Sequence, residues 1–243
     1  MEEFPYISIC TPLFNRTKWL PLMIYNLKNL DYPKDKLEWC VLDTHDKKDN
    51  IWNKLFKNDM ERKVVEVIIG FPINYVTKPN NYPIGKKRNM LVKQATHKIC
   101  ANMDSDDVML PSWLKHSIEV MRSDKKCSLV GTPEMSFVYP YLDWKITGIK
   151  CPVKRMIHEA AMVYTKKHWG CMGGFAVSSQ GEGTKLIDGH EKACLPTSAD
   201  KCIICVCHDE NTIDKDQFKD KSDRNVVLGG PIKKVLQQVL NIP

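Results

Sequence analysis

The chain has 243 residues, of which 43% are apolar and 27% are charged, a composition typical of a folded protein with a sizeable core. The formal net charge of +7 is modest and is not gathered in a dense Lys/Arg tract, so charge alone gives no reason to expect a nucleic-acid partner. An anionic small ligand suits this charge equally well.

The N-terminus and the cysteines bear on the cellular compartment. Met1, Glu2 and Glu3 are acidic overall where a secretory signal is basic, and no apolar run of suitable length follows. No segment approaches the roughly 18 to 20 apolar residues that span a bilayer. We therefore expect a cytoplasmic protein with no transmembrane segment, with peripheral membrane contact left open. The ten cysteines are then expected to be reduced thiols.

The first half of the chain alternates strand-like and helix-like segments. Short apolar runs predict strands, and apolar residues at helical spacing predict helices. In chain order these are strand 6–14, helix 18–30, strand 37–43, helix 50–62, strands 64–70 and 73–78, helix 84–96, strand 98–104 and helix 110–123. This order predicts an α/β fold with a mostly parallel sheet flanked by helices.

The second half of the chain is less regular. We expect strands within 127–140, an apolar strand at 201–208 and a short amphipathic helix at 232–241. The sequence shows no internal repeat and no low-complexity linker. We therefore predict one compact domain over 1–243, with halves 1–125 and 126–243.

Polar residues gather at three predicted strand ends, namely 12–16, 43–46 and 104–107. In open parallel sheets, ligands bind beyond the carboxyl ends of the strands. The last group places Asp104, Asp106 and Asp107 within four positions, where like charges repel unless a cation lies among them. These segments together predict a ligand site that includes a cation. The alternative for 104–107 is a solvated turn with a helix cap.

Four short motifs occur in order along the chain. A first strand ends in "TPLFNR", and a second strand ends in "VLDTHDKKD". A helix begins "GKKRN", and a further strand ends in "MDSDD". This ordered set resembles family 2 glycosyltransferases, in which the first strand ends in Pro-x-Tyr-Asn-Arg. Two departures are visible: Phe14 replaces Tyr, and the second loop differs from the usual Asp-Gly-Ser-x-Asp, which leaves the nucleobase open.

The resemblance implies a GT-A (Rossmann-like) fold and a metal-dependent, inverting glycosyltransferase of the hexosyl type. The donor would be a nucleotide-diphosphate sugar, UDP-linked by default, and the acceptor a hydroxyl group of a glycan, lipid or protein. Breaking the bond to a diphosphate builds negative charge on the leaving group, which a hard cation such as Mn²⁺ or Mg²⁺ stabilises.

The resemblance also assigns roles in the acidic cluster. It implies that Asp106 binds the metal directly and that Asp104 lies near the ribose and a metal-bound water. Asp107 would support these groups or cap the next segment.

On the nucleotide side, the resemblance implies that Pro12, Asn15 and Arg16 line the pocket and that Asp43 recognises the nucleobase or ribose. Arg88 would contact the nucleotide at a helix start, where free N–H groups attract phosphate. Lys86 or Lys87 would assist, Asp46 is a second candidate in the Asp43 loop, and the alternative for each is a solvated or turn position.

The second half should supply the acceptor site and the base. The family commonly has an acidic pair after a glycine-rich loop, and here Glu182 stands alone with Gly183 in the second place. We predict Glu182 as the catalytic base, with Asp188, Glu191 and Glu159 as rivals.

His208 ends the late strand where the family often has a histidine, which implies a further metal ligand. A structural zinc site is the alternative for this region. Its candidate ligands are Cys194, Cys202, Cys205, Cys207 and His208. The absence of a second CxxC at matching spacing counts against it.

Two other functions stay open. A nucleotidyltransferase shares the acidic metal site but normally has a glycine-rich loop after the first strand, which "TPLFNRTK" lacks. An inactive carbohydrate-binding or scaffold protein of the same fold is favoured by the missing second acid after Glu182.

Overall fold

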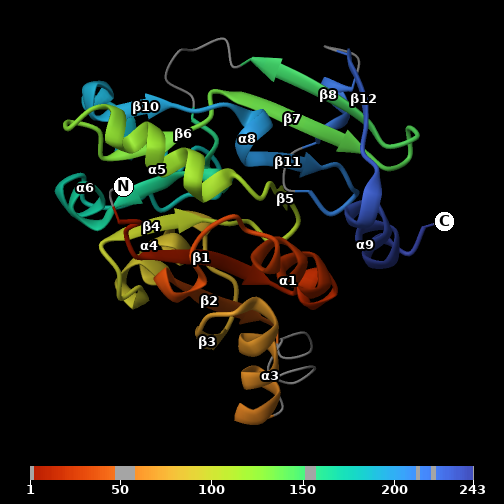
Figure 1. Cartoon of the computed structure of the whole chain (residues 1–243), viewed down its shortest axis with the longest axis horizontal. Helices are drawn as coiled ribbons and strands as arrows, with labels where there is room; N and C mark the ends of the chain where they lie inside the picture. Colours follow the sequence, from red (N-terminus) through yellow and green to blue (C-terminus); the bar gives the residue numbers. More distant parts are fainter. Residues whose placement is uncertain (1–2, 47–57, 151–156, 212–213, 220–222, 243) are drawn as a thin grey trace.

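The computed structural model describes residues 3–46, 58–150, 157–211, 214–219 and 223–242 (Figure 1). Its larger sheet has seven strands in the order β10-β6-β9-β4-β1-β2-β3. Four neighbouring strands run parallel, and β9 is antiparallel to both β4 and β6. The strands are β1 (Ile7–Phe14), β2 (Leu37–His45), β3 (Ile73–Pro79), β4 (Ile99–Asn102), β6 (Leu129–Gly131), β9 (Val163–Thr165) and β10 (Cys194–Pro196).

A second sheet of five strands lies beside the first, at the upper right of Figure 1. Its order is β12-β8-β7-β11-β5, so a strand from the acidic region of the chain pairs with one from the late region. The strands are β5 (Val108–Met109), β7 (Glu134–Tyr139), β8 (Lys145–Lys150), β11 (Ile203–Val206) and β12 (Asp223–Val227).

Helices cover both faces of the larger sheet. One apolar core contains buried residues of α1 (Leu20–Lys28), α3 (Asp59–Ile69), α5 (Trp113–Ser123) and α9 (Gly230–Leu240). The other contains buried residues of α4 (Ile84–Gln94) and α7 (Thr184–Ile187), and α6 (Lys166–Cys171) packs against it. Side chains of β1 point alternately to the two faces of the sheet, so Ile7 and Ile9 pack in the first core and Cys10 packs in the second.

The remaining described helices are short. One is α8 (Ala199–Cys202), and the others are single 3₁₀ turns. These turns are Thr17–Trp19, Lys34–Lys36, Glu159–Ala161, Glu191–Ala193 and Asp216–Phe218.

The predicted α/β fold with a mostly parallel sheet is confirmed, and most predicted elements are present. The helix predicted over 50–62 falls mainly outside the described residues, which resume at 58. The strand predicted over 201–208 is shorter than expected, because Ala199–Cys202 forms a helical turn before β11. None of the described helices is both long and apolar enough to cross a membrane.

The strand predicted over 64–70 is wrong, because this segment lies in α3. The side chain of Asn58 caps the helix start by accepting a hydrogen bond from the Glu61 N–H at 3.0 Å. Gly70 ends the helix with φ of 89°, a left-handed conformation that glycine adopts readily. Val65 and Ile69 lie one turn apart and are buried together. Packing and capping therefore prevail over the strand preference of the β-branched residues.

Candidate active site

The carboxyl ends of β1 and β2 are held together by a turn at Asn15. Its φ is 51°, in the left-handed region that asparagine tolerates better than most residues. The Asn15 N–H donates to the Thr44 carbonyl at 3.3 Å, and its side-chain oxygen accepts from the Asp46 N–H at 3.4 Å. The structure thus places the predicted site residue Asn15 as a link between two strand ends.

A cavity of about 240 Å³ opens at these strand ends. Four predicted site residues line it, namely Pro12, Arg16, Asp104 and Asp106. The other lining residues are Phe14, Asn81, Tyr82, Ile84, Lys87, Ser105 and Ser179. We call this space the donor cavity.

Asp43 lies beneath the strand ends and does not line the donor cavity. It is 1% exposed and pairs in register with Leu13. Its carboxylate accepts a hydrogen bond from the Tyr75 hydroxyl at 2.6 Å.

Lys87 lines the donor cavity. The sequence left open whether Lys86 or Lys87 assists in nucleotide binding. Lys87 is 5% exposed, and its ammonium group lies 3.5 Å from both the Leu13 carbonyl and the Asn81 side-chain oxygen. Burial, together with the neighbouring Arg88 cation, lowers the pKa of Lys87 to about 8. Lys86, in contrast, is exposed and lies over the Tyr82 ring.

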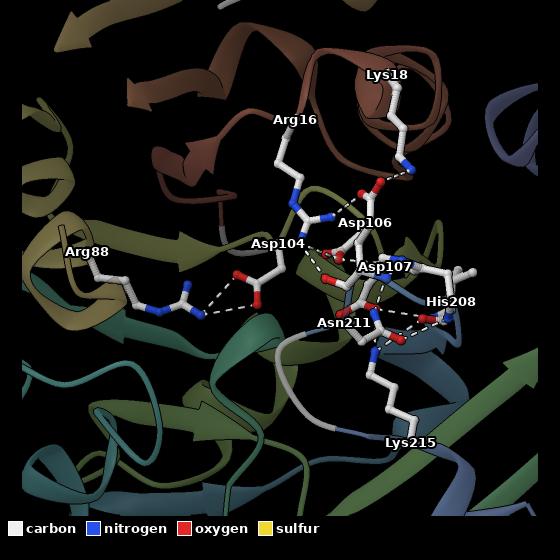
Figure 2. Close-up of polar contacts among 11 residues, drawn as sticks. Arg16, Lys18, Arg88, Asp104, Asp106, Asp107, His208, Asn211 and Lys215 are labelled. Atoms are coloured by element: carbon white, nitrogen blue, oxygen red, sulfur yellow. Dashed lines mark hydrogen bonds and ion pairs between the residues drawn. The ribbon is translucent and has the colours of Figure 1, made fainter. Parts of the chain in front are cut away.

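Asp106 and His208 meet although 102 positions separate them, as Figure 2 shows. The antiparallel pairing of β5 with β11 explains the contact, because it brings the segment after β11 beside the acidic loop. His208 Nε2 lies 3.1 Å from Asp106 Oδ2, and Arg16 lies 3.7 Å from the same oxygen. Burial opposes ionisation of Asp106, but the bond with His208 and the nearby cations hold its pKa well below its usual range.

The buried Asp107 carboxylate joins the acidic loop 104–107 to residues of the late part of the chain. Its carboxylate accepts from the Val206 N–H at 3.2 Å and lies 3.6 Å from the Lys215 ammonium. Its carbonyl accepts from the Asn26 side chain at 2.9 Å. Of the two roles left open for Asp107, the structure shows contacts of the supporting kind. Nothing in the sequence singled out Lys215 as its partner.

Arg88 is buried between two carboxylates from different parts of the chain. The side chain is 2% exposed, and its guanidinium lies 2.9 Å from Asp104 and 2.9 Å from Glu182. Burial alone would lower the pKa of Arg88, but these carboxylates raise it above its ordinary value, so the cation persists. Figure 2 shows the Arg88 fork directed at Asp104.

A second cavity, of about 160 Å³, adjoins the donor cavity and shares Ile84, Asp104, Asp106 and Ser179 with it. We call it the acidic cavity. Its other lining residues are Arg88, Asp107, His158, Glu159, Ala160, Gln180, Gly181, Glu182, Asn211 and Lys215. Of the acids considered as a base, Glu182 and Glu159 line it, whereas Asp188 and Glu191 do not.

A close backbone approach holds the loop that carries Glu182. The Gly85 N–H, in the first turn of α4, donates to the Ser178 carbonyl at 2.9 Å. A Cβ at Gly85 would lie 1.8 Å from the Ala176 carbonyl oxygen, so only glycine fits. Close packing against Ala176 therefore explains why the "GKKRN" motif begins with glycine.

The donor atoms suit a cation that also takes ligands from its substrate. Among the described residues, no three His, Cys, Asp or Glu side chains group closely enough to hold an ion by themselves. If a Mn²⁺ ion binds here, Asp106 and His208 would supply one carboxylate oxygen and one imidazole nitrogen, both of which Mn²⁺ accepts, and diphosphate and water would complete the shell.

The cysteines of the zinc alternative are dispersed in the described structure. Cys202 contacts Thr197 at 3.6 Å, whereas Cys205 contacts His158 at 3.4 Å. Among the described residues, no three His, Cys, Asp or Glu side chains lie close enough together to form such a zinc site. All nine cysteines among the described residues are free.

Residues 8–180 match the family described as Glycosyl transferase family 2, and the chain belongs to this family. One relative is the catalytic subunit of a UDP-forming cellulose synthase from Pseudomonas fluorescens (strain SBW25). It is 28% identical over 138 residues, which are 56% of this chain and 17% of that protein.

Two solved structures show the same fold. The mannosyltransferase PcManGT from Pyrobaculum calidifontis, in complex with GDP-Man and Mn²⁺, has a TM-score of 0.60 at 15% identity, over 89% of this chain and 59% of that chain. S. aureus TarS 1-349, in complex with UDP-GlcNAc, has a TM-score of 0.59 at 14% identity, over 96% and 65%. The fold is therefore GT-A, and this chain spans less than two thirds of each of these three proteins.

Proposed function

We propose that this protein is a metal-dependent, inverting glycosyltransferase that moves a hexosyl group from a nucleotide-diphosphate sugar to an acceptor hydroxyl. The observation that carries the proposal is the contact of His208 with Asp106, which together with Asp104 lines both adjoining cavities. The solved relatives with GDP-Man and UDP-GlcNAc support a nucleotide-sugar donor. UDP is our first choice, in keeping with the UDP-forming relative.

The donor cavity binds the nucleotide diphosphate in this proposal. Arg16 and Lys87 provide positive charge along its wall, which suits phosphate. Asp43 stays our candidate for recognition of the nucleobase or ribose, although it is buried and does not line the donor cavity. Arg88 positions Asp104 at the boundary between the cavities, since the two side chains form a close ion pair.

Asp106 and His208 would hold the metal, with Asp104 reaching it through water. When bound, Mn²⁺ or Mg²⁺ supplies positive charge that stabilises the departing diphosphate. The acceptor hydroxyl enters the acidic cavity, where a carboxylate takes its proton as the oxygen attacks the anomeric carbon from the opposite face. Sequence reasoning favours Glu182 for this role, and Glu159 lines the same cavity. The acceptor is a glycan, lipid or protein hydroxyl.

The substitution Asp106→Ala tests the proposal. Wild-type protein is expected to release nucleoside diphosphate from UDP-glucose, UDP-GlcNAc or GDP-mannose with Mn²⁺ and not with a chelator. Loss of the carboxylate removes a metal ligand, so Mn²⁺-dependent turnover should fall by about 100-fold or more. Colorimetric measurement of released diphosphate reports the change.

A matched control is Asp31→Ala. Asp31 is an exposed acid that pairs with Lys115 and lines neither cavity. This variant should keep wild-type turnover. If Asp106→Ala kept wild-type turnover, Asp106 would not be a metal ligand of the active site. A wild-type protein that binds sugar without any turnover would instead favour the inactive carbohydrate-binding alternative.

A further inference from the structure

Two carboxylates face the acidic cavity from the second half of the chain, and their surroundings differ. Glu182 is 4% exposed, and its Oε1 accepts from Arg88 Nε at 2.9 Å. This Glu182 oxygen is therefore already engaged by Arg88, whose guanidinium also lies 2.9 Å from Asp104. Glu182 and Asp104 together hold the buried Arg88 side chain in place.

Glu159 has no such partner. Its Oε1 accepts from the Gly183 N–H at 3.2 Å, and no side-chain cation among the described residues forms an ion pair with it. Burial raises the pKa of Glu159 above its ordinary value, and the neighbouring Glu182 carboxylate raises it further. A base with a raised pKa holds a proton more firmly near neutral pH, which makes proton transfer more favourable.

The Glu159 side chain also occupies a particular space. A Cβ built on Gly183 would lie 2.6 Å from Glu159 Cγ and 3.1 Å from Glu159 Oε1. The Glu159 side chain, together with Met162 Cε at 3.0 Å, thus borders the space that a side chain at position 183 would enter. Position 183 is the place of the absent second acid noted in the sequence, so an acid from another segment fills the same corner of the cavity.

We propose that Glu159 is the catalytic base of this glycosyltransferase and that Glu182 is a positioning residue that holds Arg88. The proposal rests on the function proposed above. The Glu159 carboxylate takes the proton of the acceptor hydroxyl as the hydroxyl oxygen bonds to the anomeric carbon. The bond from that carbon to the diphosphate oxygen breaks, and its electron pair leaves with the nucleoside diphosphate. The protonated Glu159 then returns its proton to solvent.

The test compares Glu159→Gln with Glu182→Gln in the full chain. The probes are UDP-glucose, UDP-GlcNAc and GDP-mannose with Mn²⁺, with water as the acceptor and released diphosphate as the signal. Loss of a general base costs about 100-fold or more in kcat, so Glu159→Gln should show that loss with donor KM within about twofold. Its thermal shift on adding UDP and Mn²⁺ should match the wild type, which shows an intact donor site.

The pH profile separates the two carboxylates. The acidic limb of kcat/KM reports the base, so it should persist in Glu182→Gln and vanish in Glu159→Gln. Wild-type kcat in Glu159→Gln, or a limb lost only in Glu182→Gln, overturns the inference and leaves the proposed function standing. Absence of wild-type turnover with all three donors overturns both.

A second test, for use if Glu159→Gln folds poorly, moves the carboxylate from position 159 to position 183. Glu159→Ala removes the Glu159 atoms next to position 183 and leaves Met162 Cε at 3.0 Å, the far end of a flexible side chain. The double variant Glu159→Ala/Gly183→Asp can therefore place a carboxylate in the same corner. Its activity should exceed that of Glu159→Ala by about tenfold or more, whereas Gly183→Asp alone should be impaired by the clash. A double variant no more active than Glu159→Ala contradicts the inference.

Discussion

Arg88 shows how far a single residue can be understood from its neighbours in sequence. Its place at a basic helix start predicts a contact with the nucleotide, and that contact stays a prediction. The structure shows two carboxylate partners for it, 16 and 94 positions away. Local sequence cannot name such partners, because they are chosen by the packing of separate segments.

Lys87 gives a prediction of pH dependence at the same scale. The lysine is cationic below its pKa of about 8 and increasingly neutral above it, so its attraction for diphosphate is lost as pH rises. Affinity of the wild type for UDP should therefore weaken between about pH 7 and pH 9. The loss is about tenfold, the equivalent of one charge-assisted hydrogen bond. Isothermal titration calorimetry at a series of pH values measures it.

The variant Lys87→Met should bind UDP weakly at every pH and lose this dependence. Lys86→Met is the matched control, because Lys86 is exposed on the same turn and should keep the wild-type profile. A Lys87 variant with an unchanged pH profile would assign the dependence to another group.

At the scale of elements, the start of α4 and the loop 175–183 act as one unit because of Gly85. We expect Gly85→Ala to destabilise the protein by about 2 kcal/mol or more, since its Cβ would collide with the fixed Ala176 carbonyl. Donor affinity should fall as well, because Lys87 and Arg88 belong to the same helix. Urea unfolding and UDP titration check the two effects.

Gly170 provides the control for that substitution. A Cβ at Gly170 meets no atom within 4 Å, and the residue lies in helix α6. Gly170→Ala should therefore be neutral or slightly stabilising, since alanine favours helix. Equal stability of the two alanine variants would contradict the close approach at Gly85.

At the scale of the whole molecule, the two halves of the chain are interleaved. β9 from the second half pairs with β4 from the first, and β11 pairs with β5. Each half therefore contributes strands to a sheet of the other, and the single domain over 1–243 stays a prediction.

We expect one cooperative thermal transition for the full chain and no folded state for residues 1–125 alone. Differential scanning calorimetry and circular dichroism test this. Addition of UDP with Mn²⁺ should raise the temperature of this single transition, since a ligand that binds only the folded state stabilises the whole cooperative unit. Two separate transitions, with only one of them shifted, would show that the halves fold independently.

The sequence by itself determined the α/β class, the order of most elements and the family, because these depend on local periodicity and on short ordered motifs. It also predicted a ligand site at particular strand ends, since parallel strands share one carboxyl edge. It misassigned 64–70, where β-branched residues in a capped helix resemble a strand.

Only the tertiary structure decided which side chains meet. The pairing of β5 with β11 brings His208 to Asp106, and the turn at Glu159–Ala161 brings Glu159 against Gly183. Both contacts join residues distant in sequence, and each depends on burial and strand register that no local motif encodes. The roles we propose for Glu159 and Glu182 rest on one such contact, the ion pair of buried Arg88 with Glu182.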